Sequence, residues 1–195
     1  MGATVAAAVV PAVAPAVAIV LGGAIGTFDE AERAVGIAGA WPVIIVGTND
    51  AGADWPGRLD HLVSFHTEKI GAWLERRAAA GRNVDCLIWT AEHKGAPEAI
   101  RGRLGRVPSV GGSSGLLATT VALRHARVAI LCGIPMEAAA AHYHAPGEPW
   151  REAGQYRAAW TRLRPQIAPR VRSWAGWTGR TFGMPTKEWI DAACA

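Results

Sequence analysis

The fold class is decided by Gly111-Gly112-Ser113-Ser114-Gly115, a run of small residues that opens an apolar helical pattern over residues 116–123. A strand-like run, Val128-Ala129-Ile130-Leu131-Cys132-Gly133, follows soon after. A small-residue loop at a helix start leaves backbone N–H groups free and presents the positive end of the helix dipole, which suits an anion such as phosphate. Ser113 and Ser114 add hydroxyls and also suit the N-cap. The stretch therefore predicts an α/β domain that handles a nucleotide or another phosphate compound.

Short apolar runs alternate with helical patterns along the rest of the chain. The expected strands cover residues 16–21, 42–46, 61–65, 86–89, 128–132 and 171–174. The expected helices cover residues 29–38, 68–80, 114–123, 150–163 and 186–193, and residues 95–110 are expected to form a long, mobile loop. Short strands without alternation, separated by helices, favour a parallel sheet covered on both faces. We predict one α/β, Rossmann-like three-layer domain with a mainly parallel sheet over residues 16–195, preceded by a loose leader over residues 1–15.

Composition and charge limit the class of protein. The chain has 195 residues, half of them hydrophobic, which is enough for one domain with a full core. Twelve of its 20 Lys and Arg residues are arginines from Arg101 onward, so the second half is basic. That bias is compatible with a nucleic-acid or polyphosphate partner, but no basic run is dense enough to favour nucleic acid, and a solvated face explains most of these arginines.

The cysteines and the N-terminal segment indicate the compartment. The three cysteines are widely spaced, form no metal or disulfide pattern and fit a reducing cytoplasm. The first 28 residues carry no charged side chain, so a secretory signal lacks its basic start, although a secreted protein remains an alternative. Prolines at 11 and 15 interrupt a stretch barely long enough to span a membrane, so no membrane association is expected.

Two polar loops follow the first two expected strands. Gly22, Gly23 and Gly26 permit a tight turn and close approach of a ligand, although structural turn glycines explain them about as well. Asn49 and Asp50 follow the second strand. Ligands of parallel sheets bind at the carboxyl ends of the strands, so both residues are candidates for binding ribose, base or sugar hydroxyls. An Asx-turn that only ends the strand is the alternative.

Histidines provide the candidates for proton transfer. His142 and His144 flank a tyrosine after the fifth strand and could supply a general base, because imidazole titrates near neutral pH. Their spacing also resembles a metal pair, but no third ligand is evident, and an exposed loop without chemistry is as compatible. His66 stands at the end of the third strand, where a structural role is the commoner outcome.

Nine tryptophans are unusual for this length, and five of them crowd the C-terminal third. Helical spacing from Tyr156 through Trp160 to Leu163 indicates packing against the sheet. Trp55 and Trp177 lie in Gly-rich surroundings and could instead stack a base or sugar.

Several stretches resemble a group of small hypothetical proteins encoded in phages and prophages. The resemblance covers nearly the whole chain and rests on residues 49–61, 111–115, 131–136 and 173–178. It implies a phage protein, located in the host cytoplasm or in the virion, but no established activity.

More distantly, the layout resembles single-domain, Rossmann-like bacterial sialyltransferases and pterin pyrophosphokinase-like proteins. That resemblance implies a cytidine nucleotide held by Gly22 and Gly23, by Asn49, and by Ser114 and Gly115, with His142 or His144 as the base. The first loop departs from the family, having Gly23-Ala24-Ile25-Gly26 where the family has an Asn-Gly-Pro-Ser core.

Three function hypotheses follow. The first is a phage-encoded transferase that uses a nucleotide-activated donor, most simply a nucleotide sugar. The residues expected to bind this donor include Asn49, Asp50, Ser113, Ser114 and Gly115. The second is a non-catalytic Rossmann-like phage protein, either a virion or assembly component or a binder that sequesters a nucleotide. The third, a nucleic-acid-binding protein, rests only on the basic second half. A nucleotide-type small molecule is the expected partner, no metal is expected, and a homo-oligomer is compatible with each hypothesis.

Overall fold

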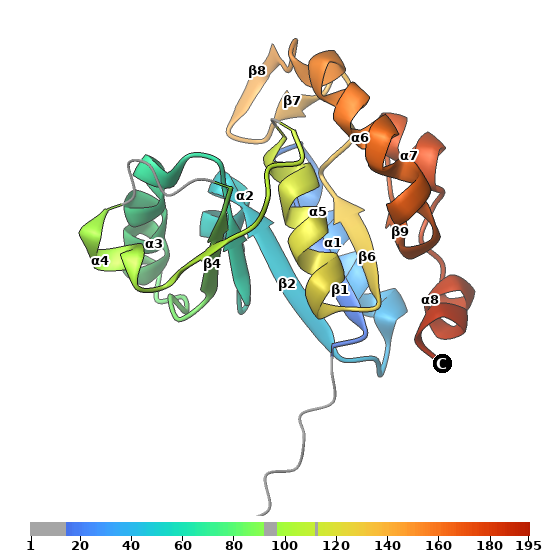
Figure 1. Ribbon diagram of the computed structural model, residues 1–195, viewed down its shortest axis with the longest axis horizontal. Helices are drawn as coiled ribbons and strands as arrows, with labels where there is room; N and C mark the ends of the chain where they lie inside the picture. Colours follow the sequence, from blue (N-terminus) through green and yellow to red (C-terminus); the bar gives the residue numbers. More distant parts are fainter. Residues whose placement is uncertain (1–14, 92–96, 112) are drawn as a thin grey trace, which may run out of the picture.

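A seven-stranded, all-parallel sheet forms the centre of the computed structural model, which describes residues 15–91, 97–111 and 113–195 (Figure 1). The strand order is β5-β4-β3-β2-β1-β6-β9. Its strands are β1 (Val17–Leu21), β2 (Val43–Thr48), β3 (His61–Val63), β4 (Leu87–Thr90), β5 (Leu104–Arg106), β6 (Val128–Cys132) and β9 (Val171–Ser173). The predicted Rossmann-like three-layer fold is confirmed, and the sheet is parallel throughout.

Helices cover both faces of this sheet. One face carries α1 (Thr27–Ala38), α2 (Asn49–Asp54), α3 (Ile70–Ala79), α4 (Glu98–Arg101) and α8 (Lys187–Cys194). The other carries α5 (Ser114–His125), α6 (Ala153–Ile167) and α7 (Gly176–Phe182). Two 3-10 turns, η1 (Thr67–Lys69) and η2 (Ala168–Arg170), complete the helical segments described.

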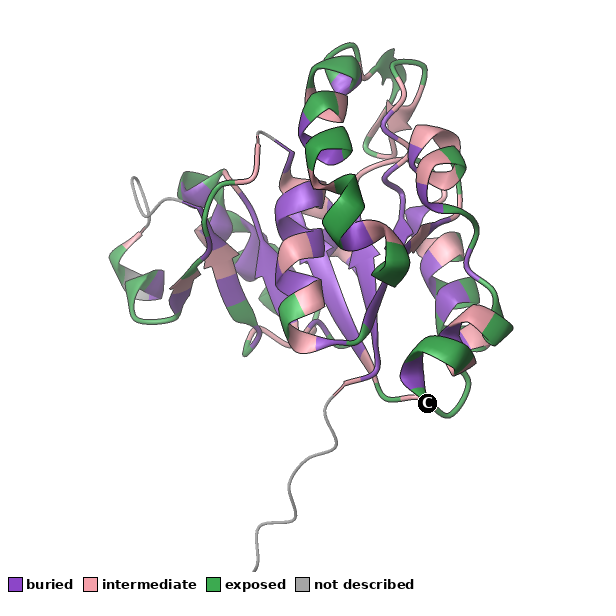
Figure 2. Cartoon of the chain, turned by 45° about the vertical axis from the view of Figure 1, so that its right-hand side comes forward, coloured by how far each residue is buried: buried purple, intermediate pink, exposed green. Residues whose placement is uncertain are grey.

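The central strands are buried on both faces because both helical layers pack on them (Figure 2). In β1, Val17, Ile19 and Leu21 join the core beneath α1, whereas Ala18 and Val20 join the core beneath α5. Side chains of a strand point alternately to the two faces, so a strand covered twice is apolar at every position. This explains why the chain shows continuous apolar runs instead of alternation.

The structure corrects several expected boundaries. The six expected strands are present, but α2, α7 and the hairpin of β7 (Ala141–His142) and β8 (Ala145–Pro149) were not expected. The long loop expected over residues 95–110 contains α4 and the edge strand β5, and its first two residues lie outside the described part of the chain. The leader expected over residues 1–15 lies, except for its last residue, outside that part as well.

The search for membrane-spanning helices covered the described residues. None of the helices there has both the length and the apolar character that crossing a bilayer requires.

Candidate functional site

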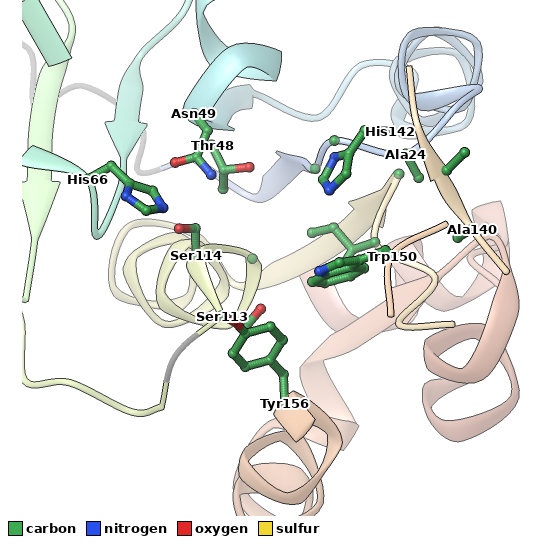
Figure 3. Close-up of a pocket in the computed structure, with 16 residues that line it drawn as sticks. Ala24, Thr48, Asn49, His66, Ser113, Ser114, Ala140, His142, Trp150 and Tyr156 are labelled. Carbon is green, nitrogen blue, oxygen red and sulfur yellow. The ribbon is translucent and has the colours of Figure 1, made fainter. Parts of the chain in front are cut away.

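A cavity of about 210 Å³ opens at the carboxyl ends of the central strands. The chain runs from β1 outward through β2 to β5 and then returns to β6 on the other side of β1, so strand order reverses between β1 and β6. Ligands of open α/β sheets bind at such a reversal. The lining comes from the segments after β1, β2, β3 and β6, from the α5 start, and from the hairpin and α6 (Figure 3): Gly22, Gly23, Ala24, Thr48, Asn49, His66, Ser113, Ser114, Gly115, Gly133, Ile134, Ala140, Ala141, His142, Trp150 and Tyr156.

The first glycine loop forms one wall because its backbone crosses the loop after β6 at close range. A Cβ atom at Gly22 would lie 2.3 Å from the carbonyl oxygen of Gly133, so only glycine fits. The hydroxyl of Thr27 donates to the carbonyl of Gly22 over 2.9 Å and fixes the turn into α1. A Cβ atom at Gly23 would lie 2.6 Å from Nδ1 of His142. These glycines therefore allow the histidine to pack directly on the loop.

The start of α5 forms the opposite wall. Ser113 is the N-cap, and its hydroxyl accepts a 3.4 Å hydrogen bond from the N–H of Leu116. The N–H groups of Ser114 and Gly115 bond to no other group in the described part of the chain. Unpaired N–H groups and the positive end of the helix dipole together favour an anion at this point. Gly112, which belongs to the same sequence stretch, lies outside the described residues.

Asn49 occupies the cavity edge with an unusual backbone. Its φ angle is 47°, a left-handed conformation that asparagine tolerates better than most residues. The hydroxyl of Ser64 donates to Oδ1 of Asn49 over 2.7 Å and itself accepts a 2.8 Å hydrogen bond from the N–H of His66. This fixes the amide so that its nitrogen is directed toward the cavity as a donor (Figure 3).

Asp50 does not line the cavity, which corrects its expected pairing with Asn49. Its carboxylate accepts hydrogen bonds from Nε1 of Trp73 (3.0 Å) and from the guanidinium of Arg76 (2.8 Å). Burial disfavours the ionised form, but the Arg76 and Trp73 hydrogen bonds outweigh it and lower the pKa of Asp50. The carboxylate connects α2 to α3, and its position does not support the binding role expected from the sequence.

Both candidate bases lie on the hairpin, but only one of the two lines the cavity. His142 lines the cavity, and its Nδ1 is buried without a hydrogen-bond partner among the described residues. His144 is exposed and lies outside the lining, with its ring centroid 5.4 Å from that of His142. Of these two histidines, His142 is therefore the one that lines the cavity.

Hydrogen bonds join the segment that carries these histidines to the first glycine loop. The N–H of Tyr143 donates to the carbonyl of Gly23 over 3.0 Å, and the N–H of Ile25 donates to the carbonyl of Ala141 over 3.2 Å. The phenol of Tyr143 also donates to a carboxylate oxygen of Asp54 over 2.7 Å. These bonds hold the hairpin over the cavity.

Three lining residues that carry rings were not among the predicted site residues. The sequence places His66 at the carboxyl end of β3, where the rule that indicated Asn49 applies as well, but a structural role was expected for it. Trp150 and Tyr156, whose ring centroids are 5.8 Å apart, form an aromatic wall beside the α5 start. Trp55 and Trp177, the expected stacking residues, lie elsewhere: Trp55 is buried, and the Arg157 guanidinium covers the Trp177 ring.

The charge of the lining is unusual for an anion site. None of the lining residues is Asp, Glu, Lys or Arg, so its titratable side chains are His66, His142 and Tyr156. No group of three or more His, Cys, Asp or Glu residues in the described ranges is arranged to hold a metal ion. The arrangement can therefore bind an anion through N–H donors, stack a planar group and exchange protons through imidazole.

Compared with protein-family models, with curated proteins and with solved structures, the chain matches none of them.

Proposed function

We propose that this protein is a transferase that binds a nucleotide-activated donor, specifically a nucleotide sugar, in the cavity at the β1–β6 reversal. The observation that carries the proposal is the convergence in one cavity of residues from separate loops. The first glycine loop, Asn49, the α5 start at Ser114 and Gly115, and His142 all line it.

The α5 start suits the phosphates of the donor. Two unpaired N–H groups at a helix N-terminus bind phosphate oxygens without a charged side chain. The amide nitrogen of Asn49 adds a donor suited to a sugar or ribose hydroxyl. The aromatic wall of Trp150 and Tyr156 is suited to stacking a base.

His142 suits the role of general base. It would take the proton of an acceptor hydroxyl as that oxygen bonds to the transferred carbon, while the bond from that carbon to the phosphate oxygen breaks. The phosphate leaves with the electron pair, and the N–H groups of α5 stabilise its charge. Because Nδ1 of His142 faces Gly23, Nε2 is the nitrogen available to the acceptor.

The resemblance to phage and prophage proteins and, more distantly, to bacterial sialyltransferases supports the same proposal. It adds the expectation that the donor carries a nucleoside and that the acceptor is supplied in a phage-infected cell.

A thermal-shift screen with nucleoside monophosphates, nucleoside diphosphates and their sugar conjugates tests the binding step. A ligand at a hundred times its Kd should stabilise the fold by about 2.7 kcal/mol, which for this size raises Tm by roughly 5–10 °C. Inorganic phosphate and free sugars at the same concentration are the controls. Binding followed by release of free nucleotide, when an acceptor mixture is added, supports the transferase. Tight binding without turnover favours the alternative, a protein that sequesters a nucleotide, and no binding overturns both.

A further inference from the structure

We infer that His66 is a second acid–base residue of this cavity, which binds the donor's phosphate from the wall opposite His142 and protonates it as it leaves. The inference rests on the proposed function and assigns a role to a residue that the proposed function does not use. His66 precedes η1 at the carboxyl end of β3, and its imidazole points into the cavity toward Ser114 (Figure 3).

The placement of His66 is fixed from both its backbone and its side chain. The hydroxyl of Ser64 accepts the N–H of His66 over 2.8 Å and donates to Asn49, so one hydroxyl positions both cavity residues. The carboxylate of Glu68 lies 3.5 Å from Nδ1 of His66. A carboxylate at one imidazole nitrogen orients the ring, which leaves Nε2 to face a ligand.

The lack of charged side chains in the cavity lining suggests that this imidazole balances the charge of a bound phosphate. A nucleotide phosphate is anionic, yet no Lys or Arg is among the described lining residues. Among the described lining residues, full positive charge can come from His66 or His142, in addition to the partial charge of the α5 dipole. The titratable groups that face His66 in the described structure are Glu68 on η1 and, across the cavity, His142 and Tyr156.

The two histidines would then divide the proton transfers. His142 begins neutral and accepts the proton of the acceptor hydroxyl, whereas His66 begins protonated and donates its proton to the departing phosphate oxygen. One bond to the transferred carbon forms and one breaks, and each histidine returns to its starting state by exchange with water. The pair implies a bell-shaped pH dependence of the rate.

NMR titration of the histidine Cε1–H signals tests the inference directly. The signals are assigned with His66→Gln and His142→Gln, and spectra are recorded from pH 5 to 8 with and without a nucleoside monophosphate or inorganic phosphate. We expect the nucleotide to move the His66 signal and to raise the pKa of His66 by about one pH unit or more, because a bound anion favours the imidazolium. His61, at the amino end of β3 and outside the lining, is the internal control and should not respond.

Kinetics give the matched test. His66→Gln should lower turnover by roughly 10²-fold and remove one limb of the pH profile, whereas His144→Gln should leave both unchanged. The His66 side chain is exposed, so the variant should keep the Tm of the unmodified chain.

The outcomes separate this inference from the proposed function. If nucleotide binds and the His66 signal and the His66→Gln kinetics are unchanged, the inference is overturned and the proposed function stands. If phosphate moves the His66 signal but no nucleotide binds, His66 is an anion ligand and the proposed function fails. If neither compound moves any histidine signal and neither binds in the thermal-shift screen, both are overturned.

Discussion

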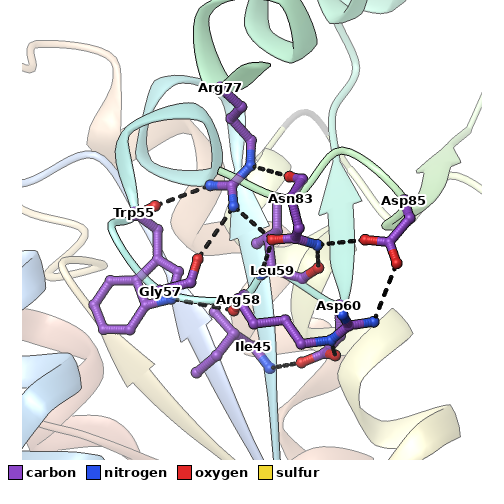
Figure 4. A network of polar contacts seen from close by, with 9 residues as sticks. All are labelled: Ile45, Trp55, Gly57, Arg58, Leu59, Asp60, Arg77, Asn83 and Asp85. Carbon is purple, nitrogen blue, oxygen red and sulfur yellow. Dashed lines mark hydrogen bonds and ion pairs between the residues drawn. The ribbon is translucent and has the colours of Figure 1, made fainter. Parts of the chain in front are cut away.

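The polar cluster around Arg77 and the cavity at the β1–β6 reversal are both built from polar groups in a largely apolar fold, and they differ in how far those groups are paired. Arg77 is fully buried. Its guanidinium donates to the carbonyls of Trp55, Gly57 and Asn83 and to the Asn83 side chain (Figure 4). It also donates to the carbonyl of Gly52, and all these distances lie between 2.8 and 3.1 Å. Arg77 therefore uses its donors within the protein.

The Arg77 cluster continues to the surface without a break. The Asn83 amide nitrogen donates to the carbonyl of Leu59 and to Asp85, while its oxygen accepts the N–H of Leu59. Arg58 pairs with Asp85 and with Asp60. In the cavity, by contrast, two N–H groups at the α5 start have no partner among the described residues. A polar group paired internally maintains the fold, whereas one left unpaired beside a cavity is available to a ligand.

The largest expected effect comes from a substitution in the cavity. His142→Ala should lower turnover by roughly 10²–10⁴-fold with little change in donor affinity, because a general base acts mainly in the transition state. Steady-state kinetics with the best donor of the screen measures it. His144→Ala, on the same hairpin but outside the lining, should turn over like the unmodified protein. Full activity in His142→Ala would remove this residue from the mechanism.

The second-largest effect comes from removing the arginine at the centre of the Arg77 cluster. Arg77→Met should lower the free energy of unfolding by about 3–5 kcal/mol, because several buried carbonyls and Asn83 lose their donor at once. Arg58→Met, in the same cluster but exposed, should cost less than about 1 kcal/mol. Denaturant unfolding measures both. Equal losses in the two variants would mean that pairing and burial do not distinguish the two arginines.

A third test uses a histidine that belongs with the paired groups. His61 is buried and accepts Nε1–H of Trp89 at Nδ1 over 2.9 Å. Burial and nearby His125 lower the pKa of His61 from 6.5 to about 4, although Asp60 opposes the shift. The unfolded chain therefore binds a proton between pH 6.5 and 4 that the fold does not. The resulting stabilisation is complete above pH 6.5 and is lost as the pH falls to 4, by roughly 3 kcal/mol.

Unfolding of His61→Gln between pH 4 and 7 checks this third prediction. The variant should lose most of the acid-dependent fall in stability, whatever its stability at neutral pH. His144→Gln, which removes an exposed histidine, should keep the slope of the unmodified chain. A slope unchanged in His61→Gln would assign the acid sensitivity to other groups.

The smallest expected effect concerns Asp50. Because Arg76 and Trp73 already occupy its carboxylate, Asp50→Asn should change nucleotide affinity by less than about twofold and lower stability by less than about 1 kcal/mol. Titration calorimetry and thermal unfolding measure the two quantities. A tenfold loss of affinity would show that Asp50 contributes to the site through α2.

The fold and part of the site could be predicted from the sequence because their signals are local. The apolar runs of β1 and β6 indicated buried strands, and the residues directly after the strands or at the α5 start, such as Gly22, Asn49 and Ser114, were correctly brought together. Each follows from chain position alone, since parallel strands place their carboxyl ends at one edge.

The remaining site residues depend on partners that are distant in the sequence. Nothing near Asp50 indicated that Arg76, 26 residues later, would occupy its carboxylate. Which of His142 and His144 lines the cavity depends on how the hairpin pairs with the first glycine loop. Nothing in the sequence around Trp150 indicated that its ring lines the cavity.

The most direct measurement is nucleotide affinity in two glycine variants at matched helix positions. Gly115 and Gly154 are each the second residue of a helix, α5 and α6. A side chain at Gly115 would meet Ile134, which also lines the cavity, at 3.2 Å, whereas a side chain at Gly154 would enter open space. Calorimetry with the tightest nucleotide of the screen should show at least about a 100-fold loss for Gly115→Val, since the valine side chain occupies the space in which the phosphate approaches the N–H groups. Gly154→Val should bind normally, and both variants should stay folded. Normal binding by Gly115→Val, or no binding by the unmodified chain, would contradict a nucleotide site at the start of α5.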